Sequence, residues 1–190
     1  MQLLIVTDIF GTQPEMLRQF DLLTLEYGCL QPYDHQPPVF VDDAEAYQYF
    51  LAHGGFEAYC NKLADLLQML SQPVFLLGFS AGAAACWANL VTEDLPIKHC
   101  LGFYGGQIRH LTELQPLYPT ELIFAEETHF SVPELMQKLS DKPYLKQNLV
   151  SYPHGFMNPL SQGYRPEAAA QFWQKIKAGY LSGLETLTLT

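Results

Sequence analysis

The stretch that decides the fold reads Pro73-Val74-Phe75-Leu76-Leu77-Gly78-Phe79-Ser80-Ala81-Gly82-Ala83-Ala84-Ala85. Its first part is a short apolar run that starts at a proline, which is typical of a fully buried strand. Its last part is rich in alanine and favours a helix. The pattern Gly78-x-Ser80-x-Gly82 between them is that of a nucleophile elbow, a sharp strand-to-helix turn that exposes a serine hydroxyl. We therefore predict a nucleophilic Ser80, with a tight turn capped by a serine as the alternative.

The composition is that of one globular domain over residues 1–190, with 48% apolar and 16% charged residues. The net charge of −10 and the lack of a basic cluster argue against binding to nucleic acid or to an anionic membrane surface. The four cysteines are scattered without a Cys-x-x-Cys or Cys/His spacing, so we expect no metal site. Since no leader-like segment and no apolar run of about 18 residues is present, we expect a cytoplasmic protein outside the membrane.

Strands and helices alternate along the whole chain. Because the strands are unbroken apolar runs, we expect an α/β fold: a mostly parallel sheet of about six strands with helices on both faces. The expected strands are 2–9, 29–31, 74–79, 97–104, 121–125 and 148–152. The expected helices are 14–28, 43–53, 56–70, 81–92, 132–139 and 166–181, followed by a loose tail over 183–188.

A serine becomes a good nucleophile only when a histidine takes its proton and a carboxylate orients that histidine. His154 follows the last predicted strand, and loops at the carboxyl ends of parallel strands line one crevice. We therefore expect His154 on the same rim as Ser80, with a plain loop histidine as the alternative. The chain order serine, acid, histidine places the acid after strand 121–125, where Glu126 and Glu127 compete. A solvated acidic loop is the alternative for at least one of them.

Two backbone amides are needed to hold an oxyanion. One should come from Ala81, directly after the serine, and the other from the loop after the first strand, at Ile9. Asp8 either contacts the elbow or the pocket, or shapes the turn at the end of this strand.

Five landmarks together resemble the dienelactone hydrolase family of the α/β-hydrolases, over about residues 2–178. They are Asp8-Ile9-Phe10-Gly11, the elbow at 78–82, Phe103-Tyr104-Gly105-Gly106, the loop 126–130 and His154-Gly155-Phe156. The resemblance implies a minimal α/β-hydrolase fold that lacks the first antiparallel hairpin of larger relatives.

This chain departs from the family pattern at three positions. Ser80 stands where the family has cysteine, and Asp8 stands where it has glutamate. Thr128 stands at the family's acid position and cannot stabilise an imidazolium, and losing that carboxylate costs about 10⁴ in rate in a well-studied triad. We therefore expect Glu127, or else Glu126, to replace it, or the site to be weak.

The resemblance also implies substrates with a carboxylate held by arginine. Arg109, after the strand 97–104, is best placed for this role, although a surface ion pair is an equal alternative. Phe10, Tyr104 and Phe156 are expected to line the substrate pocket or, alternatively, to belong to the core.

These features together predict a hydrolase that cleaves a small carboxylic ester, thioester or lactone through a Ser80 acyl-enzyme. His154 would act as base and then as acid, and no metal or organic cofactor would be needed. One alternative is a weak or inactive binding protein with the same fold, because of Thr128. Another is that Glu126 and Glu127 form a partner-binding surface. The substrate, the oligomeric state (a homodimer among the options) and a lid at 35–60 stay open.

Overall fold

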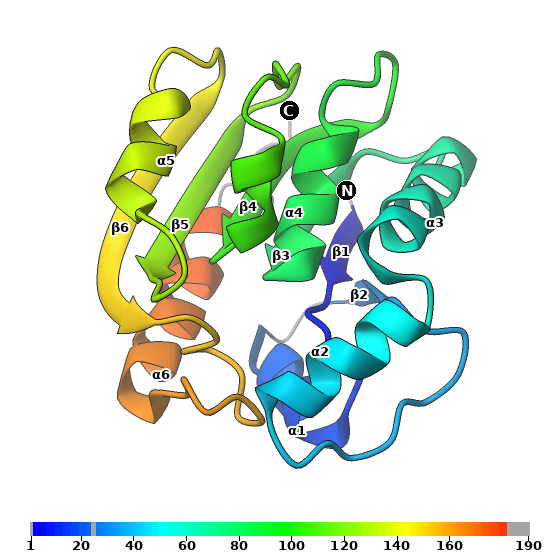
Figure 1. Ribbon diagram of the computed structural model, residues 1–190. Coiled ribbons are helices and arrows are strands. Elements are labelled where there is room, and N and C mark those ends of the chain that lie inside the picture. The colour runs from blue at the N-terminus through cyan, green and yellow to red at the C-terminus, as the bar shows by residue number, and fades with distance from the viewer. Residues whose placement is uncertain (1, 24–25, 182–190) are drawn as a thin grey trace.

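A computed structural model describes residues 2–23 and 26–181 and shows one six-stranded sheet (Figure 1). The strand order is β2-β1-β3-β4-β5-β6, and every pairing is parallel. The strands are β1 (Gln2–Val6), β2 (Tyr27–Leu30), β3 (Val74–Phe79), β4 (Ile97–Phe103), β5 (Thr120–Glu126) and β6 (Leu145–Pro153). The chain runs from β1 to β2 in one direction and then returns to β3 on the other side of β1. The order therefore reverses between β1 and β3, which is where open α/β sheets bind ligands.

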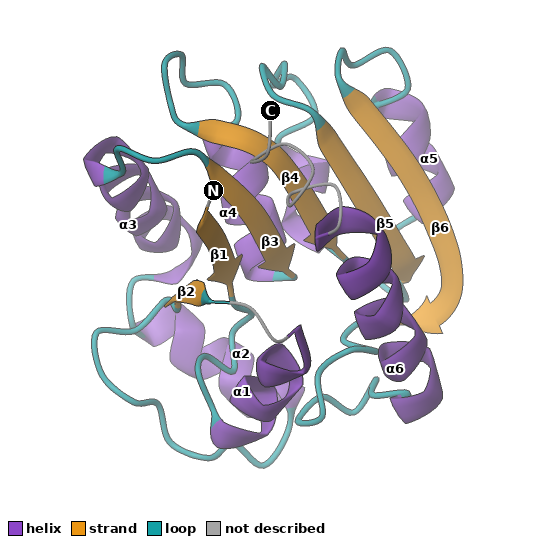
Figure 2. Cartoon of the chain, turned by 180° about the vertical axis from the view of Figure 1, so that it is seen from behind, coloured by secondary structure: helices purple, strands orange, loops and turns teal. Residues whose placement is uncertain are grey.

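Helices cover both faces of the sheet, as predicted (Figures 1 and 2). Side chains of α3, α4 and α5 belong to the core on one face, and those of α1 and α6 to the core on the other. The helices are α1 (Pro14–Phe20), α2 (Asp43–Ala52), α3 (Gly55–Met69), α4 (Ala81–Asn89), α5 (Val132–Lys138) and α6 (Pro166–Lys175), which a π-helical segment (Ile176–Leu181) extends. None of the described helices is both long and apolar enough to span a membrane.

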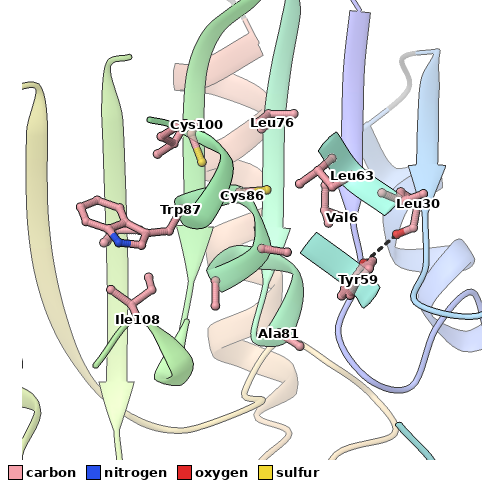
Figure 3. Close-up of a cluster of buried hydrophobic side chains, with 14 of the residues drawn as sticks. Val6, Leu30, Tyr59, Leu63, Leu76, Ala81, Cys86, Trp87, Cys100 and Ile108 are labelled. Carbon is pink, nitrogen blue, oxygen red and sulfur yellow. Dashed lines mark hydrogen bonds between the residues drawn. The ribbon is translucent and has the colours of Figure 1, made fainter. Parts of the chain in front are cut away.

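The unbroken apolar strands are explained by burial on both sides. In β1, Leu4 and Val6 pack into the first core, whereas Leu3 and Ile5 pack into the second. Figure 3 shows the first core around Trp87 of α4. At its edge, the Tyr59 hydroxyl lies 2.9 Å from the Thr7 carbonyl and 3.0 Å from the Leu30 carbonyl. Tyr59 thereby fixes α3 to the carboxyl ends of β1 and β2.

Several predicted boundaries were wrong, for local physical reasons. The first strand ends at Val6 because the following residues form a turn. The first helix ends at Phe20 and continues only as a 3₁₀ turn over Asp21–Leu23. The last strand begins earlier, at Leu145, because this edge strand carries polar residues that an apolar-run criterion misses. The predicted tail at 183–188 lies outside the described residues.

The elbow depends on two glycines that permit close backbone packing. A Cβ atom at Gly82 would overlap the carbonyl oxygens of Val6 and Thr7 in β1 and the turn after it. A Cβ atom at Gly78 would lie 2.6 Å from the Cα atom of Ala83, in the first turn of α4. The N-terminus of α4 therefore packs directly on the backbone at the end of β1.

We predict that Gly82→Ala lowers the free energy of unfolding by at least about 2 kcal/mol, because its Cβ would meet backbone atoms that cannot rotate away. Gly28→Ala in β2 is the matched control, since its Cβ would have only ordinary contacts at 3.4 Å. Urea denaturation of both variants measures the difference. Equal stability of the two would contradict this account of the elbow.

Candidate active site

Ser80 lies in the turn between β3 and α4 with a strained backbone. Its φ of 50° and ψ of −114° are rare for a residue with a side chain and are found chiefly where the surroundings enforce them. The Ser80 amide donates to the Phe103 carbonyl at 2.9 Å, and the Ser80 carbonyl accepts from the Ala84 amide at 3.1 Å. Bonds to β4 and α4 thus hold the serine in this conformation at the carboxyl end of the sheet.

His154 follows β6 directly and reaches Ser80 across the ends of two intervening strands. Figure 1 shows the lower end of β6 curving toward the carboxyl end of β5. The His154 amide donates to the Glu126 carbonyl at 3.2 Å. In the side chain of His154, Nε2 lies 2.8 Å from Ser80 Oγ, although the two residues are 74 positions apart in the sequence. The predicted nucleophile and base therefore lie within hydrogen-bond distance.

Glu127, which directly follows β5, contacts the other nitrogen of the same ring. Its Oε1 lies 2.6 Å from His154 Nδ1, and its side chain is 11% exposed, against 36% for His154. Glu126 and Thr128 are exposed, and within the described parts of the chain neither side chain has a hydrogen bond to His154. When Nδ1–H donates to the Glu127 carboxylate, Nε2 remains free to accept the Ser80 proton. The arrangement is that of a serine, histidine and acid relay.

The two amides expected to bind an oxyanion belong to the first residue of α4 and to the turn after β1, whose backbone packs on α4 at Gly82. Ala81 is the first residue of α4, and the first amides of a helix have no acceptor within it. Ile9 belongs to the turn at residues 7–11, which we call the oxyanion loop. Its carbonyl accepts from the Tyr33 hydroxyl at 2.5 Å, and no acceptor for its amide is found among the described residues. Both amides are thus available as donors.

Asp8, in the oxyanion loop, is a buried acid with two hydrogen bonds. Its Oδ1 accepts from the Phe10 amide at 3.0 Å, and its Oδ2 accepts from the Asn158 side chain at 2.6 Å. Burial raises the pKa of Asp8 to about 6, although both hydrogen bonds oppose the shift. Asn158 was missed from the sequence. The signal that could have found it is a buried acid at the end of β1, which requires a polar partner.

The aromatic residues named as pocket candidates are buried in the structure. Phe10, Tyr104 and Phe156 are at most 3% exposed, which favours the alternative that they belong to the core. Tyr104 packs against the His154 ring at 5.0 Å between centroids, and Phe156 packs against Tyr104 at 5.5 Å. These rings support the imidazole from the core.

Arg109 is engaged with the protein itself. Its Nη1 donates to the Gly106 carbonyl at 2.7 Å, and its guanidinium lies 4.9 Å from the centroid of the Phe130 ring. A Cβ atom at Gly106 would lie 3.5 Å from both Arg109 Nη1 and Glu127 Oε1. Arg109 is therefore near the acid, and its cation already has two partners.

The segment 37–43 packs against the loops on both sides of the site. Phe40 contacts Phe10 of the oxyanion loop, with ring centroids 6.0 Å apart. Asp43, at the start of α2, accepts from the Ser161 hydroxyl at 2.7 Å and from the Gln162 amide at 2.8 Å. These contacts fix the segment as the rim of the site.

A cavity of about 310 Å³ lies apart from the site. It is lined by side chains of β4, β5, β6 and α6, such as Leu101, Ile123 and Phe172, and none of the three relay residues lines it. In the described part of the chain, no group of three or more His, Cys, Asp or Glu side chains is arranged to hold a metal ion.

Comparison with known proteins yields a clear similarity of fold. No protein-family model matches the sequence. The uncharacterized protein YczH of Bacillus subtilis (strain 168) is 25% identical over 189 residues, which cover 95% of this chain and 93% of that protein. A dienelactone hydrolase from Anabaena variabilis superposes with a TM-score of 0.59 at 14% identity, over 95% of this chain and 85% of that one. The α/β-hydrolase domain-containing protein 10 from mouse gives a TM-score of 0.62 at 8% identity, over 96% and 90% of the two chains.

These similarities of fold extend over nearly the whole chain, including its six-stranded parallel sheet. The chain therefore has a minimal α/β-hydrolase fold, and the resemblance to dienelactone hydrolase-like proteins is confirmed at the level of that fold.

Proposed function

We propose that this protein is a serine hydrolase that cleaves a small carboxylic ester, thioester or lactone through an acyl-enzyme. The observation that carries the proposal is the chain of two short contacts from Ser80 Oγ through His154 to Glu127 Oε1. General hydrolase chemistry is also what the similar folds suggest. The partner is a small-molecule substrate, and the chain's own side chains supply the acid, the base and the nucleophile.

The reaction begins when Ser80 Oγ attacks the carbonyl carbon and His154 Nε2 takes the hydroxyl proton. The carbonyl oxygen becomes an oxyanion, to which the Ile9 and Ala81 amides donate. His154 then gives the proton to the leaving alcohol or thiol as its bond to carbon breaks, which leaves the acyl group on Ser80. Water attacks this acyl group with His154 again as the base. His154 then returns the proton to Ser80 Oγ as the bond between Oγ and the acyl carbon breaks, and the carboxylic acid departs.

Glu127 contributes by holding the imidazole in one tautomer and by stabilising the imidazolium that forms in each step. The alternative of an inactive binding protein rested on Thr128 at the family's acid position. The contact between Glu127 and His154 argues against that alternative, because it supplies a carboxylate at the ring nitrogen where the proposed relay needs one. The same contact argues against assigning Glu127 to a surface that binds a partner.

The substrate preference follows from the charges around Ser80. Arg109, the cation nearest to Glu127 among the described contacts, is occupied by the Gly106 carbonyl and the Phe130 ring. Asp8 and Glu127 both lie close to His154. An anionic substrate would therefore meet carboxylates without a free cation, so neutral acyl substrates fit the site best.

We predict that Ser80→Ala lowers kcat for p-nitrophenyl acetate by at least about 10⁴-fold, because the nucleophile is lost. The variant should keep the wild-type circular dichroism spectrum and lose labelling by a fluorophosphonate probe. Turnover that survives in a folded Ser80→Ala protein would refute the proposed function.

The adjacent glutamates provide a matched pair of variants for the acid. Glu127→Gln should lower kcat by about 10³-fold to 10⁴-fold, because an amide cannot stabilise the imidazolium. Glu126→Gln should change kcat less than about twofold, since its side chain is exposed and without a hydrogen bond to His154 in the described structure. Steady-state hydrolysis of the same ester measures both, and the reverse order of effects would remove Glu127 from the relay.

A further inference from the structure

The two loops that carry the proposed machinery are joined by one buried contact. The oxyanion loop holds Asp8, and residues 154–163, which we call the histidine loop, hold Asn158. Asn158 Nδ2 donates to Asp8 Oδ2 at 2.6 Å, across a sequence separation of 150 residues. Asp8 is 4% exposed and Asn158 is fully buried. Both side chains are therefore shielded from solvent, so a water molecule cannot take the place of either partner in this hydrogen bond.

On the Asp8 side, the contact sets the conformation of the oxyanion loop. Asp8 Oδ1 accepts from the Phe10 amide at 3.0 Å. The Asp8 side chain therefore bridges Ile9, from its own backbone on one side to the Phe10 amide on the other. The Gly11 amide also donates a hydrogen bond to the Asp8 carbonyl at 3.2 Å. The direction of the Ile9 amide therefore depends on the position of the Asp8 side chain.

On the Asn158 side, every polar group of the side chain and the amide has a defined partner. The side-chain oxygen accepts from the Leu160 amide at 2.8 Å, and the backbone amide donates to the Gly155 carbonyl at 2.9 Å. Because the oxygen is used by Leu160, the NH₂ group must face Asp8. Asn158 thus fixes the turn that directly follows His154.

We propose that Asp8 and Asn158 are positioning residues that hold the Ile9 amide and the His154 ring in the positions that the reaction at Ser80 requires. The proposal rests on the proposed function, because it concerns the same reaction. Neither residue contacts the reacting atoms. Each acts through the loop that it anchors, and an error of 1 Å in such groups can cost about 10²-fold in rate.

The electrostatic cost of this contact supports a role in the site. A buried carboxylate without a cationic partner costs stability, and such groups are concentrated at functional sites. The ring of His154 favours the charge on Asp8, whereas the carboxylate of Asp43 opposes it. The other titratable groups facing Asp8 are the hydroxyls of Tyr33, Tyr59 and Tyr104. Burial raises the pKa of each of these tyrosines, so they are neutral at the working pH and do not compensate the charge.

A reciprocal exchange of the two side chains tests the proposal. In Asp8→Asn alone, the new side-chain oxygen keeps the bond from the Phe10 amide. The new NH₂ group then faces the NH₂ group of Asn158, so two donors meet without an acceptor. In Asn158→Asp alone, two carboxylates face each other. In the double variant, the NH₂ group at position 8 donates to the carboxylate at position 158, and the bonds to Phe10 and Leu160 are retained.

We expect each single variant to lower kcat by about 10-fold to 100-fold with less than about a threefold change in KM. The double variant should recover kcat to within about threefold of wild type, although it differs at two buried positions. Single variants with wild-type kcat, or a double variant no better than the worse single, would overturn the proposal. Asn158→Ala, which removes the donor without adding a charge, replaces either single variant that does not fold.

The pH dependence of kcat gives a second readout that a merely structural contact would not move, and the pH dependence of stability tests the ionisation of Asp8 itself. Burial raises the pKa of Asp8 from the ordinary value of 3.8 to about 6 in the folded protein. Between these values the folded state binds more protons than the unfolded chain, so the contribution of Asp8 to stability falls as the pH rises through this window. The urea midpoint of wild type should therefore fall relative to that of Asp8→Asn between pH 4 and pH 7. The kcat of wild type should show an ionisation near pH 6 that the kcat of Asp8→Asn lacks. A pH-independent difference in both measurements would overturn the proposal.

These outcomes are separate from those that test the proposed function. An active Ser80→Ala protein would end the case for hydrolysis itself. A wild-type rate in the Asp8 and Asn158 variants would remove only the positioning role and would leave the Ser80 relay in place.

Discussion

The close packing of α4 on the backbone of β1 is the constraint on which the rest of the site depends. There is no room for a Cβ atom at Gly82, and Gly78 approaches the first turn of α4 almost as closely. This packing forces the positive φ of Ser80 and directs its hydroxyl away from the sheet. It also brings the oxyanion loop, which follows β1, next to the first amide of α4. One backbone contact thereby arranges the nucleophile and both proposed donors.

The parts of the site that follow from topology could be predicted from the sequence. Loops at the carboxyl ends of parallel strands converge, so Ser80 of the elbow motif, His154 and one of the pair Glu126 and Glu127 could be expected to share one rim, although topology did not choose between the two glutamates. Asn158 could not, because its role depends on how the histidine loop folds back onto β1, over 150 residues away. The sequence also left open whether the aromatic residues line a pocket or belong to the core, since an apolar ring next to a motif suits both, and in the structure Tyr104 is buried against the His154 ring.

The acid lies one residue before the position that the resemblance to dienelactone hydrolases indicates. Thr128, at that indicated position, is exposed, whereas the preceding Glu127 turns inward to His154 Nδ1. The loop after β5 needs only one residue of adjustment for a carboxylate to reach the ring. Identities of 8–14% to the solved structures accordingly coexist with a shared fold, and the chemistry is decided by a few side chains at the strand ends.

The carboxylates around Ser80 also bear on what happens after cleavage. In the proposed reaction a neutral substrate becomes a carboxylic acid, which ionises on release and acquires a charge of the same sign as Asp8 and Glu127. Coulomb repulsion inside a partly buried site is stronger than in bulk water, so the product is pushed outward as soon as it loses its proton. If the proposed reaction is right, this repulsion favours release of the product after each turnover and opposes inhibition by it.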